Sequence, residues 1–160
     1  MFPGLAIAEE LRARGRSREI LFLGSQRGLE TRLVPAAGFP LETLRLGGLA
    51  GMSLGARVRA SVQALAAIVR CALLYLRRRP ALVVGVGGFA SGPAVLAALL
   101  LRIPTLIQEQ NASPGLTNRW LGRWVDTVAL SFPGSERFFR NRARITVTGN
   151  PETGMSSAAS

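Results

Sequence analysis

The sequence lacks several residue types on which many enzymes depend, and each shortage narrows what the chain can do. Its 160 residues include no histidine, which excludes a histidine base or metal ligand from this chain. The single cysteine, Cys71, excludes an internal disulfide and fits a reducing compartment. There is no Cys-x-x-Cys pair and no cluster of carboxylates, so we expect neither a metal site nor a bound cofactor.

Lysine is also absent, so all 20 basic residues are arginine, and they outweigh 9 acidic residues to give a net charge of +11. Such a protein is attracted to polyanions such as anionic lipid, phosphorylated substrates or nucleic acid. Aromatic residues make up only 6% of the chain, and no module that interleaves them with basic residues is visible, so we expect no nucleic-acid partner. No signal peptide and no uninterrupted apolar run of about 20 residues is present.

Apolar runs alternate with helical patterns along the chain. This order predicts an α/β domain with a mostly parallel sheet and helices on both faces. The expected strands are 19–23, part of 39–46, 82–84, 103–107, 127–130 and 144–148. The expected helices are 3–11, 29–37, 57–79, 92–102, 113–123 and 135–141. We expect a flexible glycine-rich connection at 47–55 and an unstructured tail at 152–160.

The segment from Leu82 to Pro93 (LVVGVGGFASGP) combines a strand, a tight glycine turn and a helix start. Glycines allow backbone to approach a ligand closely, and amides at a helix N-terminus favour an anion, so the segment predicts a diphosphate site. It also fits the dinucleotide fingerprint G-x-G-x-x-A through Gly85, Gly87 and Ala90, with Glu109 as the ribose-binding acid. That fingerprint normally lies in the first βαβ unit of a domain, whereas here it follows two expected strands along the chain. A purely structural turn is the third reading.

Polar or glycine-rich clusters follow four late strands, at 85–91, 108–111, 131–133 and 149–151. Ligands bind beyond the carboxyl ends of the strands in parallel sheets. Because all four clusters should fall at one edge, we predict the ligand site there.

The longest predicted helix, 57–79, has an apolar stripe with spacings of three and four, formed by Val58, Val62, Leu65, Val69, Leu73 and Leu76. The stripe either packs in the core or, flanked by arginines, binds a membrane surface. Cys71 within the helix is expected to be a small buried residue.

Four motifs in order and register resemble the N-terminal half of the MurG-type enzymes. They are FPGLAIAEEL at 2–11, VGVGGFASGP at 84–93, QEQN with PGLTN at 108–118, and VTGNP at 147–151. These enzymes transfer N-acetylglucosamine from UDP-N-acetylglucosamine to undecaprenyl-diphospho-muramoyl pentapeptide, converting lipid I to lipid II in peptidoglycan synthesis. The resemblance implies the Rossmann-like N-terminal half of a GT-B glycosyltransferase, at the cytoplasmic face of the bacterial cell membrane as a peripheral protein, near cell-wall and division proteins.

The resemblance also implies roles for particular residues. The acceptor diphosphate would be bound by Gly87, Gly88, Phe89, Ser91 and Gly92. The UDP-sugar would contact Asn111, supported by Glu109 and Asn118. The membrane would contact Arg70, Arg77, Arg78 and Arg79. No catalytic residue is expected in this chain, because the family's histidine belongs to a glycine loop that would precede Phe2.

The sequence departs from the family pattern at several points. Gln108 replaces a histidine, Phe89 a tyrosine and Thr153 an arginine. We expect an acceptor-binding domain at 2–151 without the first central strand, and no donor domain after it. The strand that would lie beside the one ending at Gly85 would then be missing. The backbone amide and carbonyl groups on that edge of the sheet would be left unpaired. The expectation is a fragment that is poorly stable and inactive as a transferase alone.

Overall fold

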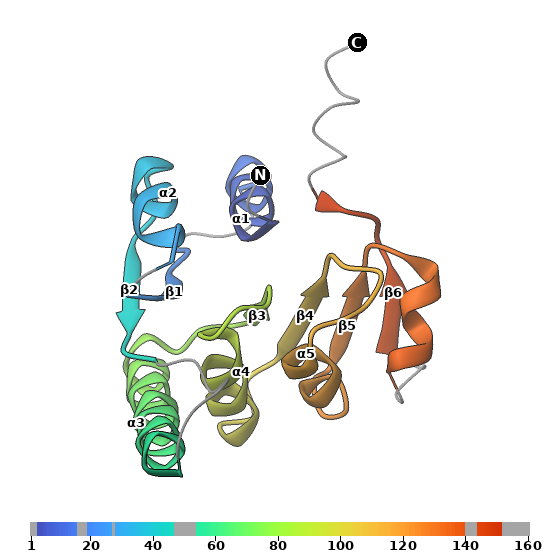
Figure 1. The fold of residues 1–160 in the computed structure, drawn as a ribbon. Helices are drawn as coiled ribbons and strands as arrows, with labels where there is room; N and C mark the ends of the chain where they lie inside the picture. Colours follow the sequence, from blue (N-terminus) through green and yellow to red (C-terminus); the bar gives the residue numbers. More distant parts are fainter. Residues whose placement is uncertain (1–2, 16–18, 27, 47–53, 140–143, 152–160) are drawn as a thin grey trace.

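The computed structural model of the chain describes residues 3–15, 19–26, 28–46, 54–139 and 144–151 (Figure 1). The strands within these ranges are β1 (Phe22–Ser25), β2 (Leu41–Leu44), β3 (Val83–Gly85), β4 (Thr105–Glu109), β5 (Thr127–Leu130) and β6 (Ile145–Val147). The helices are α1 (Pro3–Ala13), α2 (Glu30–Ala36), α3 (Leu54–Arg78), α4 (Ser91–Leu100), α5 (Leu116–Leu121) and the 3₁₀ helix η1 (Pro133–Phe138). The predicted tail at 152–160 and most of the predicted connection at 47–55 lie outside the described residues.

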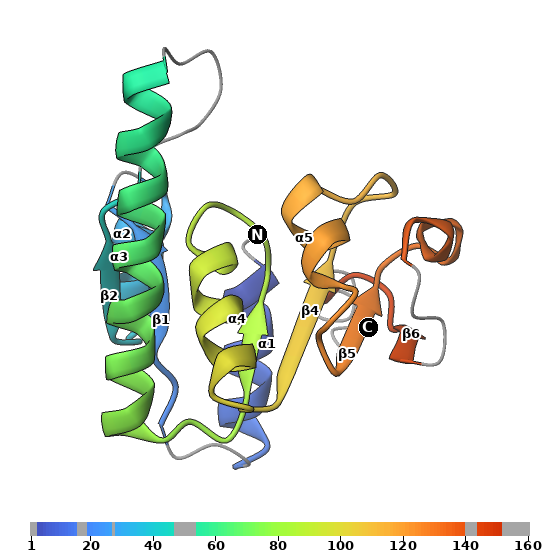
Figure 2. The same cartoon turned by 90° about the horizontal axis from the view of Figure 1, so that it is seen from below.

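Every strand pairs in parallel with its neighbour, and the described strands form two sheets. One contains β2 and β1, and the other has the order β3-β4-β5-β6. Helices α1 and α2 cover one face of the strands, and α3, α4 and α5 cover the other (Figures 1 and 2). The predicted parallel α/β fold with helices on both faces is therefore confirmed. The expected single sheet is divided, and β3 is an edge strand of its own sheet.

Apolar side chains fill the space between these layers in two clusters. The larger cluster surrounds Ile107, Leu121 and Leu130, which are fully buried. The smaller one contains Ala8, Val34 and Phe39. Removing a leucine or isoleucine side chain from water contributes about 1.5–3 kcal/mol, so each of these three residues stabilises the four-stranded sheet by about this amount.

Several element starts differ from the prediction by one to three residues, and two of them have identifiable reasons. Strand β1 begins at Phe22 rather than residue 19, because pairing with β2 begins where the Phe22 amide donates to the Pro40 carbonyl (2.9 Å). Helix α5 begins at Leu116, so Ser113 does not cap it as predicted. The amide of Gly115, which precedes the helix, donates instead to the Glu109 carboxylate (3.2 Å). A distant side chain therefore replaces the local cap.

Helix α3 buries Tyr75 and several small side chains and exposes most of its valines and leucines. Its inward face carries Ala60, Ala67, Cys71 and Tyr75, and it packs along α4, where the Tyr75 hydroxyl donates to the Ala94 carbonyl (3.2 Å). The six stripe residues named above are between 51% and 62% exposed. Of the two alternatives left open for this stripe, packing in the core is therefore excluded. Small residues face α4 because they let the two helices approach closely.

Candidate functional site

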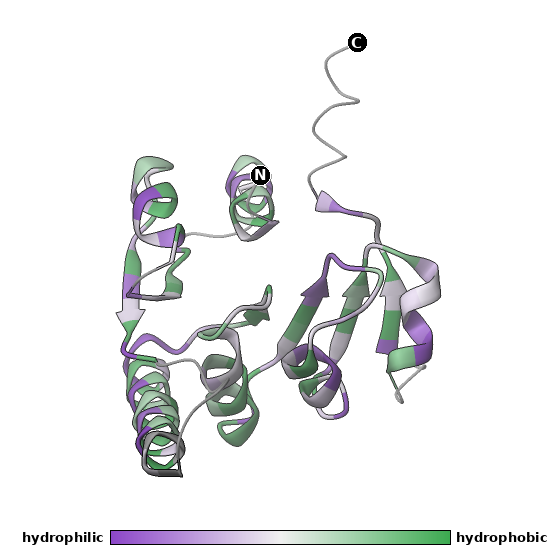
Figure 3. Ribbon diagram, viewed as in Figure 1, coloured by the Kyte–Doolittle hydropathy of each residue, from purple (hydrophilic) through white to green (hydrophobic). Residues whose placement is uncertain are grey.

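The carboxyl ends of β3 to β6 lie side by side at one edge of the larger sheet, as the parallel order requires. The body of β4 is hydrophobic and its tip is hydrophilic (Figure 3). The polar clusters that follow these four strands are therefore neighbours in space, as the sequence predicted.

The loop between β3 and α4 has the geometry of an open glycine turn. Gly87 and Gly88 have φ values of +91° and +79°, which favour glycine. A Cβ atom at Gly88 would meet nothing within 4 Å, and one at Gly87 would come no nearer than 3.9 Å to Asn118 Nδ2. Gly85 differs, because a Cβ there would lie 2.6 Å from Ser91 Oγ and 2.9 Å from Val95 Cγ2. Gly85 thus permits close packing of α4 on β3, and the next two glycines leave room for a ligand.

The predicted diphosphate-binding residues do not all face the same space. Ser91 begins α4 and is 8% exposed, and its hydroxyl has no hydrogen-bond partner among the described residues. Phe89 is 70% exposed and projects from the loop. Gly92 faces α5, since a Cβ there would lie 3.5 Å from Thr117 Cγ2. Gly87, Gly88 and the first amides of α4 therefore form the open part of the loop.

Glu109, the last residue of β4, organises the neighbouring segment. Its side chain is 2% exposed and accepts four hydrogen bonds. Oε1 accepts from the amide and side chain of Asn111, both at 2.9 Å. Oε2 accepts from the Gly115 amide at 3.2 Å and from Asn118 Nδ2 at 2.9 Å. The carboxylate therefore fixes an exposed Asn111 and a buried Asn118 in one arrangement, and the Asn118 amide lies next to Gly87.

Further bonds connect the ends of the last three strands. Gln108 Nε2 donates to Ser131 Oγ (3.3 Å), and this hydroxyl donates to the Gly149 carbonyl (3.4 Å). The Ser135 hydroxyl, 1% exposed as a residue, is shared between the carbonyls of Asn111 and Ala112 at 3.2 and 3.1 Å. Sequence reasoning missed Ser135, and its only signal was its place after Pro133 and Gly134 at a strand end.

The four arginines predicted to contact a membrane do not form one group. Arg70 and Arg77 lie seven residues apart on the α3 surface beside the exposed stripe. Arg78 lies on another side of the helix and pairs with Glu19. Arg79 ends the helix with φ +49°. By length and composition alone, Val58–Arg78 is apolar enough to cross a membrane, a test that a core helix of a soluble protein also passes.

Two titratable side chains on the inward face of α3, Cys71 and Tyr75, are buried. Burial raises the pKa of the Cys71 thiol to about 11 and also raises the pKa of Tyr75. The thiol is therefore a poor nucleophile at neutral pH. Within the described ranges, no group of three or more His, Cys, Asp or Glu side chains could hold a metal ion.

Residues 1–130 match the glycosyltransferase family 28 N-terminal domain. Two similar curated proteins are both named UDP-N-acetylglucosamine–N-acetylmuramyl-(pentapeptide) pyrophosphoryl-undecaprenol N-acetylglucosamine transferase. The one from Anaeromyxobacter sp. (strain Fw109-5) is 46% identical over 94% of this chain and 39% of its own length. The one from Rubrobacter xylanophilus is 50% identical over 91% of this chain and 42% of its own length. The chain thus spans about 40% of the length of these relatives.

Solved structures agree with the fold. The crystal structure of Acinetobacter baumannii MurG superposes with a TM-score of 0.78 at 32% identity, covering 93% of this chain and 42% of that one. The S. aureus MnaA–UDP structure has a TM-score of 0.68 at 13% identity, covering 100% of this chain and 46% of that one, and it supports the fold alone. The predicted Rossmann-like, N-terminal GT-B architecture is confirmed. On its sequence match and its fold, the chain belongs to glycosyltransferase family 28.

Proposed function

We propose that the chain is the acceptor-binding domain of an N-acetylglucosaminyltransferase of peptidoglycan synthesis. The reaction would move N-acetylglucosamine from UDP-N-acetylglucosamine to the muramoyl pentapeptide on undecaprenyl diphosphate, converting lipid I to lipid II. The names of relatives 44–50% identical to the chain support this reaction. We assign residues 2–151 to this domain, and most of the donor contacts to a region of the relatives beyond the matched part.

The observation that carries the proposal is the open glycine loop at the start of α4. Two left-handed glycines leave space beside the N-terminus of a ten-residue helix. Amides at such a terminus favour negative charge by about 0.3–1 kcal/mol for each favourable contact at an exposed site. The nearby Ser91 hydroxyl is buried and has no hydrogen-bond partner in the part of the chain that the structure describes, so it would supply a further donor. A diphosphate fits this set of groups.

The Glu109 network gives the second half of the proposed site. Glu109 would act as a positioning residue, because its bonds hold Asn111 at the exposed end of the strand. Asn111 would then contact the UDP-sugar, with Asn118 supporting the glycine loop. In the transfer itself, a base would deprotonate the acceptor hydroxyl, which attacks the anomeric carbon as UDP leaves. The chain contains no histidine, so this base is not assigned to a histidine here.

Binding of farnesyl diphosphate, a short soluble analogue of the lipid acceptor, tests the proposed diphosphate site at the glycine loop. Titration calorimetry should show binding to the 160-residue chain, weaker binding of farnesyl monophosphate, and little binding of NAD. The variant Gly88→Asp places a carboxylate in the open space and should weaken diphosphate binding by about tenfold or more through charge repulsion. Gly15→Asp, also at an open glycine with a positive φ (+61°), is the matched control. Tighter binding of NAD than of farnesyl diphosphate would favour the dinucleotide alternative.

We also propose that α3 binds the cytoplasmic face of the cell membrane, near proteins of cell-wall synthesis and division. Its exposed stripe of valines and leucines is flanked on one side by Arg59, Arg70 and Arg77, which recur at spacings of eleven and seven residues. Each arginine near anionic lipid contributes about 1 kcal/mol. Because the opposite face of α3 packs along α4, surface binding fits better than a membrane span.

Sedimentation with vesicles containing phosphatidylglycerol tests this second proposal. Replacing Leu65 and Leu73 by serine should abolish sedimentation at physiological salt. Replacing Arg70 and Arg77 by glutamine should weaken it mainly at low salt. Leu100→Ser, at a still more exposed leucine on α4, is the control. Sedimentation unchanged by both sets of substitutions would refute the membrane role and leave the diphosphate site untouched.

A further inference from the structure

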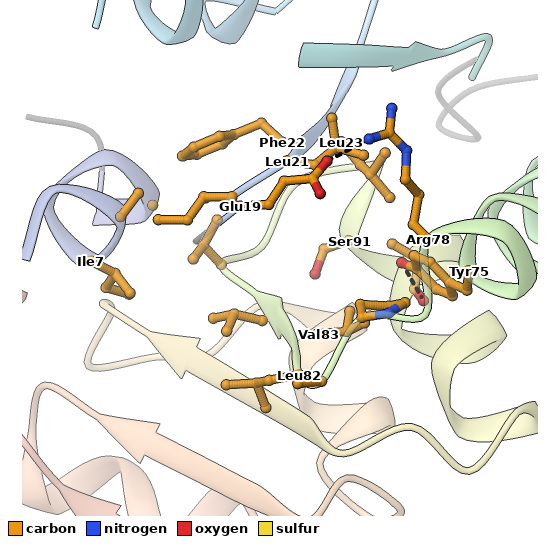
Figure 4. Close-up of a pocket in the computed structure, with 18 of the residues that line it drawn as sticks. Ile7, Glu19, Leu21, Phe22, Leu23, Tyr75, Arg78, Leu82, Val83 and Ser91 are labelled. Carbon is orange, nitrogen blue, oxygen red and sulfur yellow. Dashed lines mark hydrogen bonds and ion pairs between the residues drawn. The ribbon is translucent and has the colours of Figure 1, made fainter. Parts of the chain in front are cut away.

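Two buried polar atoms near the glycine loop have no hydrogen-bond partner in the part of the chain that the structure describes, namely Ser91 Oγ and Asn118 Oδ1. Their surroundings differ. Ser91 lines a cavity of about 500 Å³ between β1 and β3 (Figure 4), whereas Asn118 lies on α5 and is not among the residues that line this cavity. The proposed diphosphate site makes use of the Ser91 hydroxyl but not of the Asn118 oxygen, although Asn118 is only 4% exposed.

The Glu109 carboxylate fixes the orientation of the Asn118 side-chain amide. Asn118 Nδ2 donates to Glu109 Oε2 (2.9 Å), and the same oxygen accepts from the Gly115 amide (3.2 Å). Because Oε2 acts as an acceptor here, reversing the Asn118 side-chain amide would place two acceptors against each other. Oδ1 is therefore held on the side away from Glu109, as a hydrogen-bond acceptor.

This acceptor lies beside the open glycine turn. A Cβ atom at Gly87 would lie 3.9 Å from Asn118 Nδ2, and the nitrogen and oxygen of one side-chain amide are about 2.3 Å apart. Gly87 and Gly88 have positive φ values and no side chains, so the backbone of the turn can shift to admit a ligand atom. A group bound at the turn is therefore within reach of Oδ1.

An unpaired buried acceptor restricts which ligands fit the site, because leaving it unsatisfied costs free energy. The oxygens of a diphosphate that is bonded at both ends are acceptors without protons at neutral pH, so they cannot pair with Oδ1. A prenyl chain has no polar hydrogen either. A sugar bonded to the diphosphate carries hydroxyl groups and, in an acetamido sugar, an amide N–H. Of these three parts of a lipid-linked acceptor, only the sugar can pair with Asn118.

We propose that Asn118 is a specificity-determining residue, and that its Oδ1 accepts a hydrogen bond from a hydroxyl or amide N–H of the sugar attached to the bound diphosphate. The inference rests on the diphosphate site proposed above and gives the bound acceptor a direction, with its sugar toward α5. Glu109 holds Asn111 through one oxygen and Asn118 through the other. An acceptor sugar in this position lies next to Asn111, the residue proposed to contact the UDP-sugar.

Titration calorimetry of the full 160-residue chain with three ligands tests this role. The ligands are farnesyl diphosphate and its esters with N-acetylglucosamine and with cyclohexanol on the second phosphate. The cyclohexyl ester presents a six-membered ring without donors, and neither ester adds a charge. The sugar ester should bind about tenfold more tightly than the cyclohexyl ester, because only the sugar satisfies Oδ1.

Methylation of the acetamido nitrogen distinguishes the two kinds of donor. Loss of the preference on methylation assigns the bond to the amide N–H, and its retention assigns the bond to a hydroxyl. Either result supports the proposal, because both donors belong to the sugar.

The variant Asn118→Leu keeps the approximate size of the side chain and removes the acceptor, so the preference for the sugar ester should disappear. Thr117→Val removes an exposed hydroxyl on the same helix, beside Gly92, and is the matched control that should keep the preference.

The side-chain nitrogen resonance of Asn118 in NMR spectra gives a second readout, which uses the unsubstituted chain and does not depend on the folding of a variant. It should shift when the sugar ester binds and much less when the cyclohexyl ester binds, since a bond accepted at Oδ1 polarises the side-chain amide.

Equal affinities for the sugar and cyclohexyl esters would overturn the role of Asn118, as would a preference that persists in Asn118→Leu. Binding of farnesyl diphosphate that Gly88→Asp weakens would in both cases still support the diphosphate site. Absence of binding of all three ligands would refute the diphosphate site and this inference together.

Discussion

At the scale of single residues, the candidate site depends on a buried carboxylate that is held entirely by neutral donors. Oε2 of Glu109 accepts from the Gly115 amide and the Asn118 side chain. The substitution Glu109→Gln replaces one carboxylate oxygen by an NH₂ group, which cannot accept a hydrogen bond. Because both oxygens of Glu109 accept from two donors each, the NH₂ group faces donors in either orientation. We expect a loss of about 1–3 kcal/mol in the free energy of unfolding, measured by urea denaturation.

The matched control for this substitution is Glu136→Gln at an exposed glutamate of η1, which should change the free energy of unfolding by less than about 0.5 kcal/mol. Equal effects of the two substitutions would show that the four bonds to Glu109 contribute nothing to stability.

Asp126 lies at the opposite end of the sheet and gives the fold a dependence on pH. The amide and hydroxyl of Thr105 donate to its carboxylate (2.9 and 3.0 Å), which lowers the pKa of Asp126. A depressed folded-state pKa contributes stability above the ordinary value for aspartate, and that contribution disappears as pH falls through the folded-state value. The effect is small because Asp126 is exposed.

The substitution Asp126→Asn should therefore lower the melting temperature at pH 6, and the difference from the unsubstituted chain should shrink below about pH 4. Thermal denaturation from pH 2 to pH 6 measures this convergence. A constant difference at every pH would mean that the charge of Asp126 does not matter.

At the scale of elements, two glycines of the β3–α4 turn should respond differently to the same replacements. Gly85 is limited by contact, because a Cβ would lie 2.6 Å from Ser91 Oγ, whereas Gly88 is limited only by its positive φ. Alanine at either position should cost about 1–3 kcal/mol. Asparagine, which tolerates left-handed backbone, should cost less than alanine at Gly88 and more than alanine at Gly85. Urea denaturation of the four variants gives the order, and the same order at both glycines would contradict this explanation.

Whether a segment forms a helix or a strand could largely be predicted from sequence. Which neighbouring elements each of its faces contacts could not. The run Thr127–Leu130 became β5 with the bounds predicted, because its ends are marked by polar residues and Pro133. The periodicity of α3 predicted a stripe correctly but does not say what the stripe faces. The competing face of alanines, Cys71 and Tyr75 packs better along α4, and nothing in the spacing ranks the two faces.

The candidate site shows the same division. The convergence of the strand ends follows from parallel topology, and the sequence was sufficient for it. The four bonds to Glu109 were not predictable, because Asn118 reaches that carboxylate only after the chain turns into α5. The inward position of Ser91 and the outward one of Phe89 likewise depend on the path of the loop.

At the scale of the whole molecule, the net charge of +11 opposes the compact state. Raising sodium chloride from about 0.01 to 0.15 M shortens the Debye length from about 30 to 8 Å and weakens repulsion between the arginines. We expect the melting temperature to rise over this range. Replacing Arg59, Arg70 and Arg77 by glutamine lowers the charge by three and should reduce the rise. A melting temperature that falls with salt would show that attractive pairs dominate instead.

Each of the two sheets is built from one continuous stretch of chain, residues 22–44 for β1 and β2 and residues 83–147 for β3 to β6. The cluster of Ala8, Val34 and Phe39 likewise uses only early residues. During synthesis, the first unit leaves the ribosome before β3 has been translated, so the nascent chain can fold in two successive steps. Until the second unit emerges, Leu44 lacks the larger cluster that buries it. This interval is therefore the one in which the polypeptide most needs a chaperone.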